Sequence, residues 1–106
     1  MEKKLHILFI CGWFPSKVLP TNGDFIMRHA QAVATIHKVS VIHIISDDTV
    51  TEDYIDFNTE NNLNIYIGYV RKTKNPILKI RRFWKLYNQI LKKVDAFDVV
   101  HLNEIF

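Results

Sequence analysis

The sequence is poor in the residues that mark several common kinds of site. Its 106 residues include one cysteine, three glycines and three prolines. The single cysteine, Cys11, excludes an intrachain disulfide and suits a reducing compartment. Gly12 and Gly23 lie too far apart for the G-x-G-x-x-G dinucleotide motif, and the sequence contains no Walker motif, which argues against the usual dinucleotide and ATP sites. No set of histidine, cysteine and carboxylate residues has ligand-like spacing, so we predict no metal site.

The sequence also has no long hydrophobic run, and one long stretch of it has no acidic residue. The apolar run over residues 5–10 is far below the roughly 20 residues that cross a bilayer, and no small-residue cleavage site follows it. We therefore expect a buried strand there, no transmembrane segment, and a cytoplasmic protein. No Asp or Glu lies between Asn61 and Val94, yet the formal net charge is only +3. With no recognisable nucleic-acid module, this modest charge predicts no nucleic-acid partner.

Four short runs rich in branched and aromatic residues predict β-strands. They cover residues 5–11, 39–45, 63–70 and 97–102. The first two are nearly continuous apolar runs, a pattern typical of parallel strands covered on both faces. Residues 46–62 are polar and acidic without clear periodicity, so we expect a surface connection there with at most a helical turn.

Two amphipathic helices are expected between the strands. The first covers about residues 24–36, with Thr21 or Asn22 as its cap, and the second covers about residues 76–94 with proline in its first turn. Apolar residues at helical spacing predict the inner face of the second helix. They are Ile80, Phe83, Trp84, Tyr87, Ile90 or Leu91, and Val94. The order of elements predicts an α/β fold with a Rossmann-like parallel sheet and flanking helices.

Two loops beyond the carboxyl ends of the strands are candidate sites, because open parallel sheets bind ligands there. In the first loop, a glycine would let the backbone approach a phosphate or sugar, and a tryptophan could stack on a sugar. Without a ligand, turn geometry explains the glycine and packing of the loop on its domain explains the tryptophan. Its candidate residues are Gly12, Trp13, Gly23 and Asp24. The second loop is the exit of the last strand, with His101, Asn103 and Glu104, where His101 is alternatively a core histidine.

The second helix also carries basic residues without acidic neighbours. Lys79, Arg82 and Lys85 fall mostly outside its predicted inner face. Such residues form either a solvated face or a contact with an anionic membrane surface, to which each contributes about 1 kcal/mol. The second interpretation predicts a protein peripheral to the inner face of the membrane.

Four segments together resemble the start of a GT-B-fold glycosyltransferase of the large retaining family 4, the group 1 type. Their order and spacing span nearly the whole chain. They are the strand Leu5-His6-Ile7-Leu8-Phe9-Ile10, the turn Trp13-Phe14-Pro15, the segment Gly23-Asp24-Phe25-Ile26-Met27-Arg28-His29-Ala30-Gln31-Ala32-Val33-Ala34, and the strand Phe97-Asp98-Val99-Val100-His101.

The resemblance implies that residues 1–106 are a partial N-terminal, acceptor-side domain, truncated before the C-terminal donor-binding domain. The parent enzyme would transfer a sugar from a nucleotide-sugar donor to a glycan, lipid or small-molecule acceptor. These residues alone would be inactive and would hold no cofactor. Gly23 would approach the donor phosphates, and the exit of the last strand would lie near the reacting sugar.

Two departures from the family pattern leave the catalytic residues unassigned. Asp24 stands where the family often has a second glycine, and Asn103 stands where it often has a histidine that could act as a base. Truncation would leave the edge of the last strand open, so we expect homodimerisation through that edge. The alternative function is a non-catalytic α/β module that docks a partner or a membrane through its basic helix.

Overall fold

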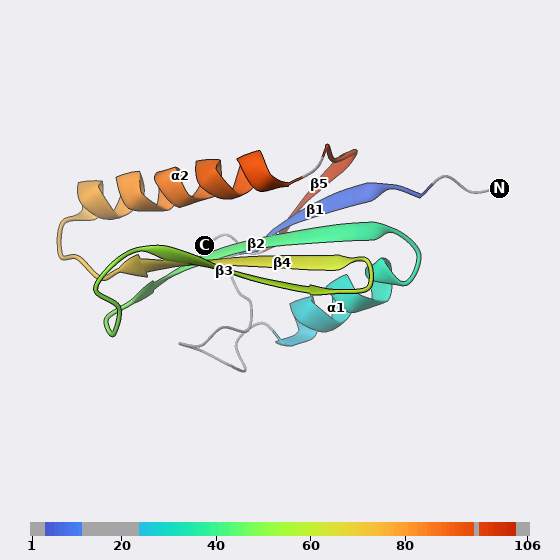
Figure 1. The fold of residues 1–106 in the computed structure, drawn as a ribbon, viewed down its shortest axis with the longest axis horizontal. Coiled ribbons are helices and arrows are strands. Elements are labelled where there is room, and N and C mark those ends of the chain that lie inside the picture. Colours follow the sequence, from blue (N-terminus) through green and yellow to red (C-terminus); the bar gives the residue numbers. More distant parts are fainter. Residues whose placement is uncertain (1–3, 12–23, 95, 104–106) are drawn as a thin grey trace.

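A computed structural model describes residues 4–11, 24–94 and 96–103 of the chain. A five-stranded sheet with the order β3-β4-β2-β1-β5 lies between two helices (Figure 1). This arrangement confirms the Rossmann-like α/β prediction. The elements are β1 (His6–Cys11), α1 (Asp24–Ala34), β2 (Lys38–Asp47), β3 (Tyr54–Glu60), β4 (Leu63–Arg71), α2 (Pro76–Lys93) and β5 (Val99–Asn103).

The parallel part of the sheet follows from its apolar runs. β1 pairs in parallel with β2 on one side and with β5 on the other, and β2 also pairs in parallel with β4. Val39, Val41 and Ile42 of β2 are fully buried, because both faces of this central strand are covered. The four predicted strands and the two predicted helices are all present, with ends that differ by a few residues.

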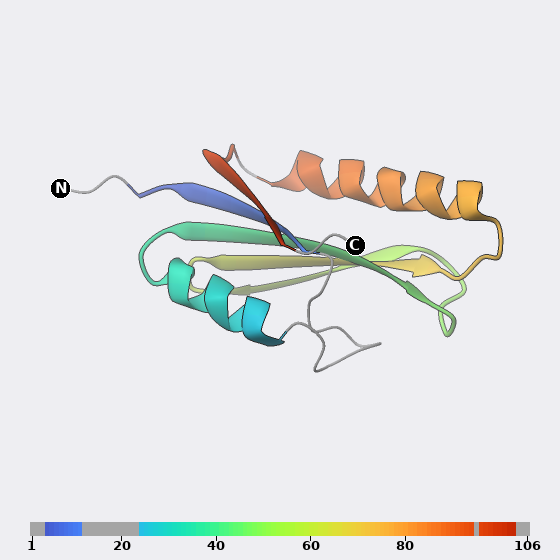
Figure 2. The same cartoon turned by 180° about the vertical axis from the view of Figure 1, so that it is seen from behind.

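The two helices cover opposite faces of the sheet (Figures 1 and 2). On one face, Ile26 and Ala30 of α1 pack with Phe9 of β1 in one buried cluster. On the other face, Ile90 of α2 packs with Leu8, the neighbour of Phe9 in the strand. Successive strand residues point to opposite faces, so β1 contributes to both cores.

The start of α2 agrees with the sequence, but part of its predicted inner face is wrong. The Asn75 side chain caps the helix, because its Oδ1 accepts hydrogen bonds from the backbone N–H groups of Ile77 and Leu78 at 3.0 and 3.3 Å. The inner face is formed by Phe83, Leu86, Tyr87, Ile90 and Val94. Ile80 and Trp84 instead belong to a second apolar stripe and are 69% and 70% exposed.

The prediction of a surface connection over residues 46–62 is wrong, because this segment contains β3. This strand pairs antiparallel with β4, and the Tyr54–Tyr69 and Phe57–Tyr66 rings lie 4.9 and 4.7 Å apart across the pair. A two-residue turn at Asn61 and Asn62 joins the strands, with Asn61 at a φ of 49°. Asparagine tolerates this left-handed conformation, which short hairpin turns require.

A buried polar network fixes the amino end of β1. The His6 imidazole donates from Nδ1 to the Ala96 carbonyl at 2.8 Å and accepts at Nε2 from the Ser40 hydroxyl at 2.7 Å. The His6 backbone N–H donates to an Asp98 carboxylate oxygen at 2.9 Å. The network joins β1, β2 and the segment before β5 at the edge opposite the strand exits, so we assign it a structural role.

Candidate functional site at the carboxyl ends of β1 and β5

The strand order defines one point where a ligand would lie in an open parallel sheet. The chain leaves β1 towards β2 through α1 on one face, and it returns from β4 to β5 through α2 on the opposite face. β5 lies on the free side of β1, with Cys11 opposite Asn103. The strand order therefore reverses between β1 and β5, which is the point where open parallel sheets bind ligands.

An aromatic cluster with two histidines lies between α1, β1 and β5. The His101 ring stacks on Phe9 with a centroid distance of 5.0 Å and an interplanar angle of 23°. The His29 ring, from α1, lies 5.7 Å from Phe9 and 5.9 Å from His101, edge-on to both. Phe9 is buried, whereas both histidine side chains are exposed. The interpretation of His101 as a core histidine is therefore wrong.

The cluster can hold polar groups of a ligand. A neutral imidazole donates a hydrogen bond from one ring nitrogen and accepts at the other, which matches the hydroxyl groups of a saccharide. The buried Phe9 ring orients His101 by stacking, and α1 brings a second imidazole next to it. Arg28, the neighbour of His29 in α1, is exposed as well and adds a cation to the same helix.

A third histidine lies buried next to the end of β1. His43 of β2 pairs in register with Cys11, and its Nδ1 donates to the Cys11 carbonyl at 2.9 Å. Burial lowers the pKa of His43 below its ordinary value of 6.5, and the hydrogen bond to Cys11 offsets this only in part. On the other face, burial and then the electrostatic effect of Cys11 raise the pKa of Tyr87 above its ordinary value of 10.0.

Acid is expected to destabilise the fold through His43. Its folded-state pKa is lowered, so below about pH 6.5 the unfolded chain binds more protons, and the free energy of unfolding falls by up to about 1.4 kcal/mol per pH unit. Urea unfolding at a series of pH values measures this slope. His43→Asn should reduce the dependence of unfolding free energy on pH while keeping an amide donor for the Cys11 carbonyl. His29→Asn, at an exposed position, should leave that dependence unchanged. An equally steep slope in His43→Asn would contradict the assignment.

The structure locates only part of the predicted site. Asp24 begins α1 and Asn103 ends β5, so the backbone of both borders the strand exits. Lys79, Arg82 and Lys85 belong to α2. Four further predicted site residues lie outside the described residues: Gly12, Trp13, Gly23 and Glu104. Within the described part of the chain, no group of three or more His, Cys, Asp or Glu residues could hold a metal ion.

Sequence reasoning missed the role of His29. His29 is not among the candidate site residues that the sequence indicated, yet it contacts Phe9 and His101. His29 lies midway along α1, and its contact with His101 depends on how this helix packs on the sheet, so no spacing in the sequence indicated it. Comparisons with known proteins add nothing here: no family model, curated protein or solved structure matches the chain.

Proposed function

We infer that this chain is the acceptor-side domain of a retaining glycosyltransferase, which transfers a sugar from a nucleotide-sugar donor to a glycan, lipid or small-molecule acceptor. The observation that carries this proposal is the exposed pair His29 and His101 on the α1 side of β1 and β5, two residues before the carboxyl end of β5. Their ring nitrogens suit saccharide hydroxyl groups, and the four family-like sequence segments point to the same activity. The donor would bind mainly to a second domain.

The proposal predicts binding of an acceptor without turnover by this chain alone. Saturation-transfer NMR with a panel of saccharides and nucleotide sugars should detect an acceptor, and a product assay on the same mixtures should detect no transfer. His101→Ala should weaken acceptor binding by about three- to tenfold, the effect of one hydrogen bond. Gln31→Ala, an exposed change on the same helix, is the control. Robust turnover by the 106 residues would contradict the need for a donor domain.

A non-catalytic binding module is the second candidate, because α2 exposes large apolar side chains next to basic ones. A phosphoryl-accepting receiver module would need acidic groups clustered at the strand exits for metal binding. Asp47, at the end of β2, instead accepts hydrogen bonds from the N–H and hydroxyl groups of Thr49 at 2.9 and 2.7 Å. A binding module would show partner capture through α2 and no saccharide binding at His29 and His101.

The exposed side of β5 supports self-association as a further part of the proposal. Among the described strands, β5 pairs with β1 alone, and Val99, Val100 and Leu102 are all exposed. A second copy could add its own β5 to this edge. Sedimentation at increasing concentration tests the idea, and a strictly monomeric chain would refute it.

A further inference from the structure

The outer side of α2 carries an apolar strip that does not contact the sheet. Ile77, Ile80 and Trp84 follow one another at helical spacing and lie on one side of the helix. Their side chains are 70%, 69% and 70% exposed, whereas Leu86 and Ile90 on the opposite side are buried. We call Ile77, Ile80 and Trp84 the outer strip. Three such large residues side by side form a contiguous apolar patch, which marks an interaction surface.

Within α2, the charged residues beside the outer strip are all positive. Lys85 also lines a neighbouring surface pocket together with Glu52 and Asp53. α2 contains no acidic residue, and Arg81 and Lys85 each follow a residue of the strip. Both cations, together with Arg82, line a shallow surface cavity of about 550 Å³ with Ile80 and Trp84. The strip and its cations therefore form one surface, apolar along its length and basic beside it.

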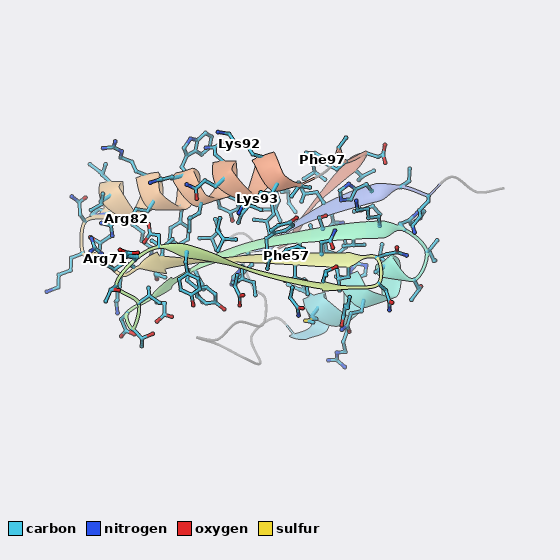
Figure 3. The ribbon with its side chains drawn as sticks, viewed as in Figure 1. Phe57, Arg71, Arg82, Lys92, Lys93 and Phe97 are labelled. Carbon is cyan, nitrogen blue, oxygen red and sulfur yellow. The ribbon has the colours of Figure 1, made fainter. Side chains whose placement is uncertain are left out.

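The other basic residues of α2 do not all lie on the same side of the helix (Figure 3). Lys79 lies over the Phe83 ring at 5.7 Å, and Arg82 donates to the Arg71 carbonyl at 3.3 Å. Lys93 borders Phe57 of β3, whereas Lys92 points away from the sheet (Figure 3). Of the cations that the sequence indicated for membrane contact, Arg82 and Lys85 line the cavity beside the outer strip, whereas Lys79 does not.

We propose that the outer face of α2 docks on an anionic lipid bilayer, with Ile77, Ile80 and Trp84 entering the interface and Arg81 and Lys85 contacting lipid headgroups. Amphipathic helices with Trp on one side and basic residues beside it bind membranes in this way. No helix among the described residues is long and apolar enough to cross a membrane.

Charge favours the lipid surface over a second copy of the chain. A symmetric dimer through this face would bring Arg81 and Lys85 of one copy against the same cations of the other, and like charges repel. An anionic bilayer has the opposite sign and takes up apolar side chains at the same time. Each cation near such a surface strengthens binding by about fivefold. The proposal is independent of the glycosyltransferase activity.

Trp84 itself reports the docking. The chain has two tryptophans, so Trp13→Phe leaves Trp84 as the sole indole, and its fluorescence is titrated with phosphatidylcholine vesicles with or without phosphatidylserine. We expect a blue shift and cosedimentation with the phosphatidylserine vesicles alone, both reversed by salt. Equal binding to both vesicle types, or an unshifted emission, would overturn the proposal.

Two pairs of variants test which side of α2 contacts the vesicle surface. Arg81→Gln with Lys85→Gln should weaken vesicle binding by about 25-fold, two fivefold steps. Lys79→Gln with Lys93→Gln removes the same charge on the sheet side and should cost less than about fivefold. Equal losses in the two pairs would overturn the assignment of this face.

The apolar contribution needs its own variant. Ile77→Ser with Ile80→Ser changes only exposed side chains, so circular dichroism should be unchanged while the blue shift is lost. An unchanged blue shift would overturn the role of the strip. Sedimentation without vesicles gives the competing outcome: self-association that shields Trp84 would overturn lipid docking in favour of a dimer through α2.

Discussion

Phe9→Ala is expected to lower the free energy of unfolding by about 3–5 kcal/mol, the usual cost of removing a buried phenylalanine ring. The Phe9 side chain is 2% exposed and packs in one cluster with Ile26 and Ala30 of α1. Removing it leaves a cavity between helix and sheet that neighbouring residues fill only in part. The change also takes away the ring on which His101 stacks, so it should disturb the candidate site together with the fold.

Urea unfolding followed by circular dichroism measures this loss, with Phe57→Ala as the matched control. Phe57 lies on the edge strand β3 and is 51% exposed, although it too contacts an aromatic ring, that of Tyr66. Its removal should cost about 1 kcal/mol, mainly the value of the ring pair. Equal losses for the two variants would contradict the burial of Phe9 under α1.

Ile90→Ala is expected to cost about 2–5 kcal/mol, whereas Ile80→Ala should stay within about 0.5 kcal/mol of the original chain. Both residues are isoleucines of α2, but Ile90 is 0% exposed and Ile80 is 69% exposed. Ile90 packs with Leu8 and Ile42 on the sheet, so its truncation opens a cavity there.

This pair decides which side of α2 packs on the sheet. The urea concentrations at the midpoints of unfolding compare the stabilities of the two variants directly. This holds because the unfolding free energy should fall with urea concentration at a similar rate in both variants. A larger loss for Ile80→Ala would favour the inner face that periodicity alone predicted. It would also remove the basis for the outer strip as a docking surface.

Sequence periodicity predicted the existence of α2 but not its rotation. The helix has apolar residues on both sides, so the pattern fits two inner faces, and only the contact with the sheet selects the one that contains Leu86 and Ile90. Leu86 also lies close to Gly68, where an added Cβ would approach its Cδ1 to 3.0 Å. A glycine in the sheet therefore helps to set the position of the helix, and single-sequence periodicity does not show this.

The sequence did not predict β3, because β3 is an edge strand. One side of it pairs with β4, and its residues from Phe57 to Glu60 are exposed, so the apolar alternation that marks a half-buried strand is weak. The Asn61 and Asn62 turn was the usable signal, since two turn residues between strand-forming runs indicate a hairpin. The buried parallel strands were predictable because their apolar runs are continuous.

The sequence indicates where a ligand would lie in such a sheet, but it does not indicate that His29 and His101 are in contact. The rule for open parallel sheets selects the carboxyl ends of β1 and β5, and the strand order agrees with it. The contact between His29 and His101 joins residues far apart in the sequence, and it depends on how α1 lies against β1. No spacing in the sequence encodes that contact.

The most direct test of the proposed function is to follow the histidine ring signals by NMR during titration with a saccharide acceptor. The account predicts that the signals of His29 and His101 shift together and saturate, while those of His6, bonded to Ser40 at the other end of β1, stay in place. Saccharide binding that leaves the His29 and His101 signals unchanged would contradict the assignment of the acceptor site to these two histidines.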